Sequence, residues 1–169
     1  SNMARIGNAS TTSIGGYAAW SNLSDGRFKK GVQEDVPGLD FILQLRPVTY
    51  HLDVNALAQF NRTPDSLRRF ENERLKEAIT QTGFIAQEVE AIAKKLNFDF
   101  SGIDAPQNSE SHYSLRYAEF VVPLVKSVQE LNEKLASENE ELKQELNNLR
   151  LSVQEQLNIL NAKIEALSE

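Results

Sequence analysis

The longest regular pattern of apolar residues lies in the C-terminal part of the 169-residue chain, where such residues recur every three or four positions. The eleven steps from position 128 to position 167 average about 3.55 residues, between the spacing of a coiled coil and that of a straight helix. A helix is predicted to begin near Ala118 and to continue through Pro123, which a first turn tolerates. The predicted seam consists of Val128, Leu131, Leu135, Asn139, Leu142, Leu146, Leu149, Val153, Leu157, Leu160, Ile164 and Leu167.

A helix with such a stripe must bury it against another surface. No glycine or proline follows Pro123, so folding back as a hairpin is disfavoured and self-association is the better interpretation. Docking onto a helix of another protein, as an adaptor, is the alternative. The seam itself does not fix the number of strands, because leucine is permissive and Asn139 sets register more than stoichiometry.

Shorter elements precede this helix. Residues 37–45 predict a short amphipathic helix that Pro47 stops, and residues 48–52 alternate as a strand. A second helix is expected over 87–96, with Val89, Ile92 and Ala93 on its apolar face. Residues 98–112 resemble a loop, and residues 113–117 alternate as a strand. The expected class is α+β, a small mixed domain followed by a coiled-coil helix.

Residues 53–80 have the character of an insertion. Thr63 and Pro64 are typical of a helix start, with the threonine as N-cap and the proline at the first helical position. The apolar residues that follow are only weakly periodic among many charges. We therefore expect a surface helix or helical hairpin here rather than a catalytic lobe.

The first 23 residues alternate short apolar runs with turn residues, which indicates short strands joined by tight turns. This stretch is too short to bury a core alone. It is interpreted as the end of a larger β-rich fibre, or alternatively as a hairpin of the domain itself. Ser1-Asn2 is interpreted as the remnant of a tag, and no secretory signal is visible.

Composition removes several classes of function. Cysteine is absent, which excludes disulfides and thiol catalysis, and two histidines make a structural zinc site improbable, so no metal or cofactor is expected. A net charge of −6 argues against a general nucleic-acid partner. No apolar run approaches the roughly 18–20 residues that span a bilayer, so no membrane partner is expected.

A candidate for chemistry lies at Ser24 and Lys29, five residues apart with Asp25-Gly26 between them. A serine hydroxyl needs a base to act as a nucleophile, and a lysine can serve only in its neutral form. A turn could bring the two side chains together, and a backbone amide near Gly83 is a candidate donor to the oxyanion, because glycine permits close approach. In an arbitrary protein, the same pair would be a turn serine followed by solvated basic residues.

Four segments favour the catalytic interpretation of Ser24 and Lys29. Together with the long helix, they resemble the endosialidase-type intramolecular chaperone, the S74 peptidase family. Members of this family are found at the C-terminus of phage tail fibres, spikes and bacterial surface fibres. The segments are Ser24-Asp25-Gly26-Arg27-Phe28-Lys29-Lys30, Leu45–Tyr50, Gly83–Glu90 and Tyr113–Tyr117. The resemblance implies a homotrimer whose partner is itself. It also implies a covalently linked N-terminal passenger that the module helps to fold and then releases.

The resemblance also implies specific roles. Ser24 is expected to be the nucleophile, Lys29 the base, and Leu23–Ser24 the bond that is cut, which makes the chain a self-cleaving, single-turnover serine endopeptidase. Some relatives carry an assisting histidine two residues before the glycine, where this chain has Gln81, so cleavage is expected to be slow or to depend on the dyad alone.

The expected organisation is a passenger remnant at 1–23, a chaperone and autoprotease domain at 24–117, and a trimeric coiled coil at 118–169. A structural trimerisation module that does not cut itself is the alternative. The expected location is a virion tail fibre or a bacterial cell surface.

Overall fold

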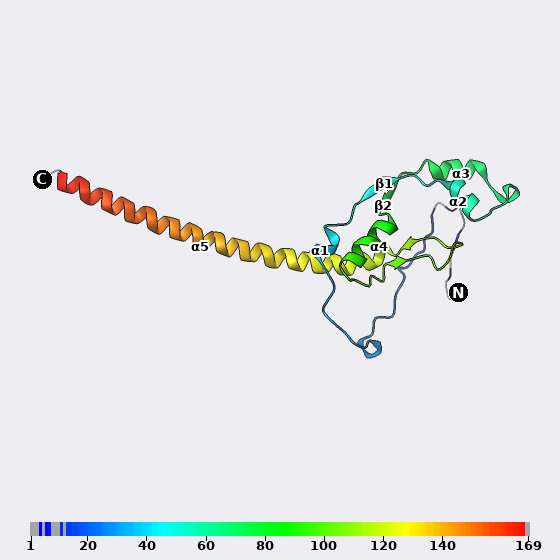
Figure 1. Ribbon diagram of the computed structural model, residues 1–169, viewed down its shortest axis with the longest axis horizontal. Helices are drawn as coiled ribbons and strands as arrows, with labels where there is room; N and C mark the ends of the chain where they lie inside the picture. The colour runs from blue at the N-terminus through cyan, green and yellow to red at the C-terminus, as the bar shows by residue number, and fades with distance from the viewer. Residues whose placement is uncertain (1–3, 5, 8–10, 12, 168–169) are drawn as a thin grey trace.

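The computed structural model describes residues 4, 6–7, 11 and 13–167. It shows a small mixed head, residues 37–120, from which one long helix projects (Figure 1). This helix, α5, spans Val121–Leu167 and follows directly on the 3-10 helix η3, Tyr117–Phe120. Pro123 lies in the first turn of α5, where its missing N–H breaks no helical hydrogen bond. The mixed class with a long C-terminal helix is therefore confirmed.

The head contains two small antiparallel sheets. Strand β1 (Val48–Tyr50) pairs with β2 (Gln81–Gly83), with Val48 opposite Gly83 and Tyr50 opposite Gln81. Strand β3 (Ile103–Asp104) pairs with β4 (Ser114–Leu115). Both predicted strands are present but shorter than the pattern suggested, and the predicted loop 98–112 contributes β3.

A cluster of phenylalanines forms the centre of the head. Phe41, on the short helix α1 (Leu39–Ile42), is fully buried. Its ring lies 5.3 Å from that of Phe98 and 5.0 Å from that of Phe100, both edge-on, as aromatic pairs prefer. Phe120, at the end of η3, closes the cluster 4.8 Å from Phe100. The core therefore joins α1 to the root of α5.

Helix α4 (Ala86–Lys95) covers this cluster with Val89 and Ala93, both buried, as the periodicity predicted. It ends in a Schellman motif, in which Asn97 adopts φ 51° and the Phe98 N–H donates to the Ala93 carbonyl at 2.9 Å. Asparagine tolerates this left-handed conformation. The reversal turns the chain so that Phe98 packs against the core.

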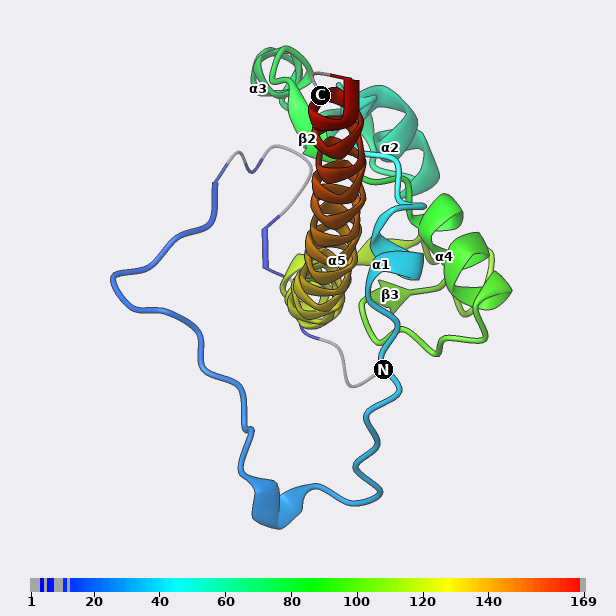
Figure 2. The same cartoon turned by 90° about the vertical axis from the view of Figure 1, so that its left-hand side faces the viewer.

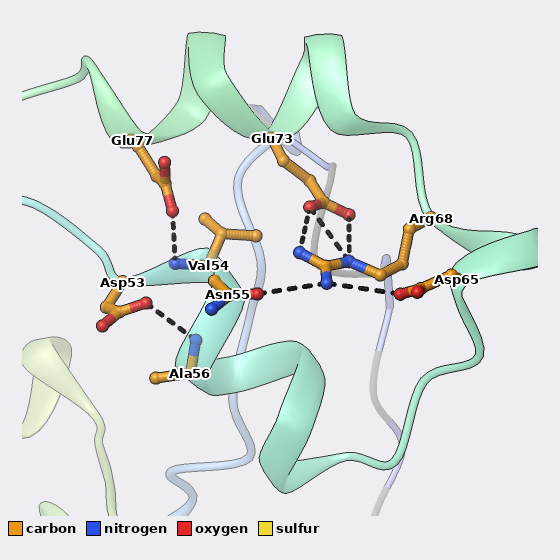
Figure 3. Close-up of polar contacts among 8 residues, drawn as sticks. All are labelled: Asp53, Val54, Asn55, Ala56, Asp65, Arg68, Glu73 and Glu77. Atoms are coloured by element: carbon orange, nitrogen blue, oxygen red, sulfur yellow. Dashed lines mark hydrogen bonds and ion pairs between the residues drawn. The ribbon is translucent and has the colours of Figure 1, made fainter.

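The predicted insertion is a helical hairpin made of α2 (Val54–Phe60), η2 (Asp65–Leu67) and α3 (Phe70–Glu77). Figure 3 shows what joins its two arms: the nearly buried Arg68 guanidinium lies 2.8 Å from the Glu73 carboxylate and donates to the Asn55 side chain at 3.1 Å. The Glu77 carboxylate accepts from the Val54 N–H at 3.0 Å. The hairpin is confirmed.

The predicted start of its second helix at Thr63-Pro64 is wrong. Pro64 precedes only the single turn of η2, after which the backbone of Arg68 is extended and α3 begins at Phe70. The extended backbone places the Arg68 side chain against both Glu73 and Asn55. A contact within the folded hairpin thus overrides a local helix signal.

No strand is present among the described residues that precede the head. Their only regular element is a short 3-10 helix, η1 (Gly26–Phe28), and Figure 2 shows the segment around it as an open loop that stands away from α5 before the chain returns to α1. The prediction of short strands is therefore wrong for the described part of residues 3–23, where no second strand is available to accept their hydrogen bonds. Residues 1–3, 5, 8–10 and 12 lie outside the described part.

Candidate active site

Ser24 and Lys29 are brought together by the turn η1. Asp25 caps this turn, and its carboxylate accepts from the Arg27 N–H at 2.9 Å and pairs with the Arg27 guanidinium at 2.6 Å. The hydrogen bonds from Arg27 hold the pKa of Asp25 below its usual value. The Lys29 N–H then donates to the Gly26 carbonyl at 3.1 Å and closes the turn.

The outcome of this turn is a direct contact between the two predicted side chains. The Lys29 Nζ donates to the Ser24 Oγ at 3.0 Å, within the reach that a nucleophile and its base require. Both residues are exposed in the single chain.

Gly83 and Gln81 lie elsewhere, on β2. In both views of the chain, η1 is well separated from β2 (Figures 1 and 2). The amide after Gly83, that of Phe84, donates to the Tyr117 hydroxyl at 3.1 Å. A Cβ at Gly83 would stand 2.2 Å from that oxygen. The Tyr117 hydroxyl therefore occupies the space that the missing Cβ of Gly83 leaves open. The roles expected for Gly83 and Gln81 stay predictions.

A groove of about 580 Å³ lies beside this tyrosine, between β1 and β4. Its lining includes Tyr50, Phe84 and Tyr117 together with His112, to which the sequence analysis assigned no role. His112 lies in the loop just before β4, and no periodicity of the sequence marks it as a residue of this groove. Within the described residues, no group of three potential metal ligands comes together.

The apolar positions predicted along α5 are all exposed in the single chain, from Leu131 at 46% to Leu167 at 88%. Val121 and Leu124 extend the same stripe by one heptad toward the head and are also exposed, at 56% and 45%. These two positions precede Val128, where the predicted seam begins, and were not predicted. A continuous apolar surface of this length on a solvated helix indicates an interaction surface.

Comparison with known families decides the class of this domain. A family model described as the chaperone of endosialidase, Peptidase_S74, matches residues 24–97. Residues 24–97 belong to the chaperone-of-endosialidase family. The matched segment begins at Ser24 and runs through the turn that joins Ser24 to Lys29, β1, the helical hairpin, β2 and α4. No curated protein and no solved structure matches the chain.

Residues 1–23 and 98–169 lie outside that match, and the second of these ranges includes the amphipathic helix α5. Within the described residues, no helix is both long and apolar enough to cross a bilayer. The domain's family membership thus rests on the part that contains the Ser24–Lys29 contact and most of the head.

Proposed function

We propose that this chain is a trimeric intramolecular chaperone that assists the folding of an N-terminal passenger and then cuts itself off at Leu23–Ser24. The 3.0 Å contact between the Lys29 Nζ and the Ser24 Oγ carries the proposal, because the family match begins at this serine. The exposed stripe along α5 supports self-association. Three associated helices hold three passenger chains at high local concentration, which lowers the cost of bringing them together.

The proposed cut begins with attack of the Ser24 Oγ on the Leu23 carbonyl carbon, while neutral Lys29 accepts the hydroxyl proton. The hydroxyl belongs to the residue that follows the scissile bond, so proximity is built in by covalent connection. The resulting tetrahedral centre collapses by breaking the C–N bond, and the Ser24 nitrogen leaves with the proton returned by Lys29. This yields an ester between Leu23 and Ser24, which water hydrolyses to a Leu23 carboxylate and a free Ser24 hydroxyl.

Both side chains are exposed in the single chain, so association of the three chains is the proposed source of the burial that activates Lys29. The cut would then follow assembly rather than precede it. Release becomes irreversible, since the passenger no longer shares a chain with the module.

Intact mass of the purified chain under denaturing conditions tests this function, with Ser24→Ala and Lys29→Ala in parallel and Lys30→Ala as the matched control. We expect the parent and Lys30→Ala to lose the 23 residues before Ser24 and the two dyad variants to remain whole. A parent that stays full-length as an assembled trimer would refute the protease and leave a structural trimerisation module. A chain that stays monomeric would refute the chaperone assembly itself.

A further inference from the structure

The first turns of α5 carry an apolar groove that the chain's own head does not fill. Its floor is formed by valines of α5 and of the segment leading into α1, and it measures about 480 Å³. Val121, Val122 and Val125 are each more than half exposed. We call it the valine groove; its residues are Glu34, Val36, Val121, Val122, Val125, Lys126 and Gln129.

A matching apolar side chain stands on α1. Leu43, at the C-terminal end of this helix, is 76% exposed, whereas Phe41 is fully buried. Asp40 lies three residues earlier and therefore on the same face, and it too is exposed. Nothing in the described head covers this leucine, although its helix is held firmly in place.

The anchoring of α1 fixes where Leu43 points. The Leu39 N–H donates to the Glu130 carboxylate of α5 at 2.7 Å, and Gly38 lies so close that a Cβ there would stand 2.8 Å from the Ser127 nitrogen. Pro123, Ser127 and Glu130 thus form the flank of α5 that faces its own head. The valine groove lies on the other flank and shares Val121 with the exposed stripe, whose Leu124 and Val128 run between the two flanks.

Figure 2, viewed along α5, shows α1 and α4 on one side of this helix. When parallel helices associate through a central stripe, one flank of each helix faces the opposite flank of the next. Each head would then stand beside the valine groove of the neighbouring chain. The same relation repeats around a threefold axis and closes after three contacts.

We propose that Leu43 of each chain inserts into the valine groove of the next chain, so that three identical contacts close a ring of heads at the root of the coiled coil. This rests on the proposed trimer. The rim of the groove carries both signs of charge: Lys126, which lies 4.0 Å from Glu130 of its own helix, would attract Asp40, and Glu34 would repel it. The chain's own Leu43 lies on the opposite flank of α5 and is not the occupant.

Crosslinking tests the contact directly, because the chain has no native cysteine. The full chain with Leu43→Cys and Val125→Cys is treated with a short bis-maleimide and examined by denaturing electrophoresis, with each single variant alongside. Leu67→Cys with Val125→Cys is the matched control, since Leu67 is 73% exposed but lies in the helical hairpin. We expect covalent trimers from the first pair and none from the control.

Sedimentation of Leu43→Asp gives a second measurement that does not depend on crosslinking geometry. Removing the leucine contact is expected to raise the concentration at which trimers half-dissociate by about tenfold or more, with Leu67→Asp unchanged. A trimer that gives no crosslink between chains, and in which Leu43→Asp changes nothing, overturns the ring alone. A parent chain that is not a trimer overturns both the ring and the proposed function.

Discussion

Gly38 offers the sharpest test of how the head is fixed to α5. It precedes α1 and has no side chain to cap that helix, so the Glu130 carboxylate of α5 takes this role by accepting from the Leu39 N–H at 2.7 Å. A Cβ at position 38 would stand 2.5 Å from the Glu130 Oε2 and 2.8 Å from the Ser127 backbone nitrogen. The first atom can move with its side chain, but the second belongs to the helix.

The cost of Gly38→Ala follows from these two contacts. Forcing a methyl group into a filled site costs about 1–3 kcal/mol. Displacing the Glu130 carboxylate from the Leu39 N–H costs about 1–2 kcal/mol more. This value lies at the low end of the range for hydrogen bonds to charged acceptors, because Glu130 is partly exposed to solvent. The expected loss is about 2–5 kcal/mol, which for a domain of this size lowers the Tm by roughly 10 °C or more.

Thermal and urea unfolding at one fixed protein concentration measure this loss, because association contributes to the apparent stability. Gly26→Ala is the matched control, since a Cβ there would meet nothing within 4 Å. Glu130→Ala combined with Gly38→Ala should cost less than the sum of the two, because one of the clashes disappears. If Gly38→Ala unfolds within about 0.5 kcal/mol of the control, the account of this junction is wrong.

Two further substitutions probe the hairpin and the seam. The hydrogen bond from Arg68 is the main cause that lowers the pKa of Glu73 below its ordinary value of 4.5. The ion pair of Arg68 with Glu73 therefore stabilises the fold above about pH 4.5, and this contribution is lost as the pH falls through the lower pKa of the folded state. As the pH is lowered through this range, the melting temperature of Glu73→Gln should therefore fall less steeply than that of the parent, whereas the exposed control Glu71→Gln should behave as the parent does. Equal slopes in the two variants would refute the pairing. Leu146→Asp places a charge in the middle of the exposed stripe and should convert trimers to monomers in sedimentation, whereas Gln144→Asp, off the stripe, should not; an intact Leu146→Asp trimer would contradict the assigned seam.

Much of the architecture follows from local signals. The helical run of α5, the apolar face of α4 and the strand after Pro47 were all predicted from periodicity and turn residues. In α4, Val89 and Ala93 are buried on the face that the pattern defines. The contact between Ser24 and Lys29 was predicted as well. It depends on a turn of a few residues, which Asp25 and Arg27 hold by themselves.

What the sequence did not reveal depends on contacts between distant segments. Phe41 is the centre of the core, yet the pattern over 37–45 predicted an amphipathic helix without marking this residue. Phe98 and Phe100 lie in a stretch without periodicity and reach the core only through the reversal at Asn97. Tyr117, 34 residues after Gly83 in the chain, occupies the space beside that glycine, and no local pattern linked the two residues.

The direct junction between η3 and α5 has a consequence for alignment. Phe120 is buried in the head and Val121 begins the helix, so each head is mounted on its helix without a flexible joint. In the proposed trimer, a slip of one heptad would therefore displace a whole head by about 10.5 Å along the axis. Extended chains advance about 3.3 Å per residue, so the passenger strands would be offset by about three residues. In such a trimer, the register in which the three α5 helices pair would set the register in which the three passenger chains align.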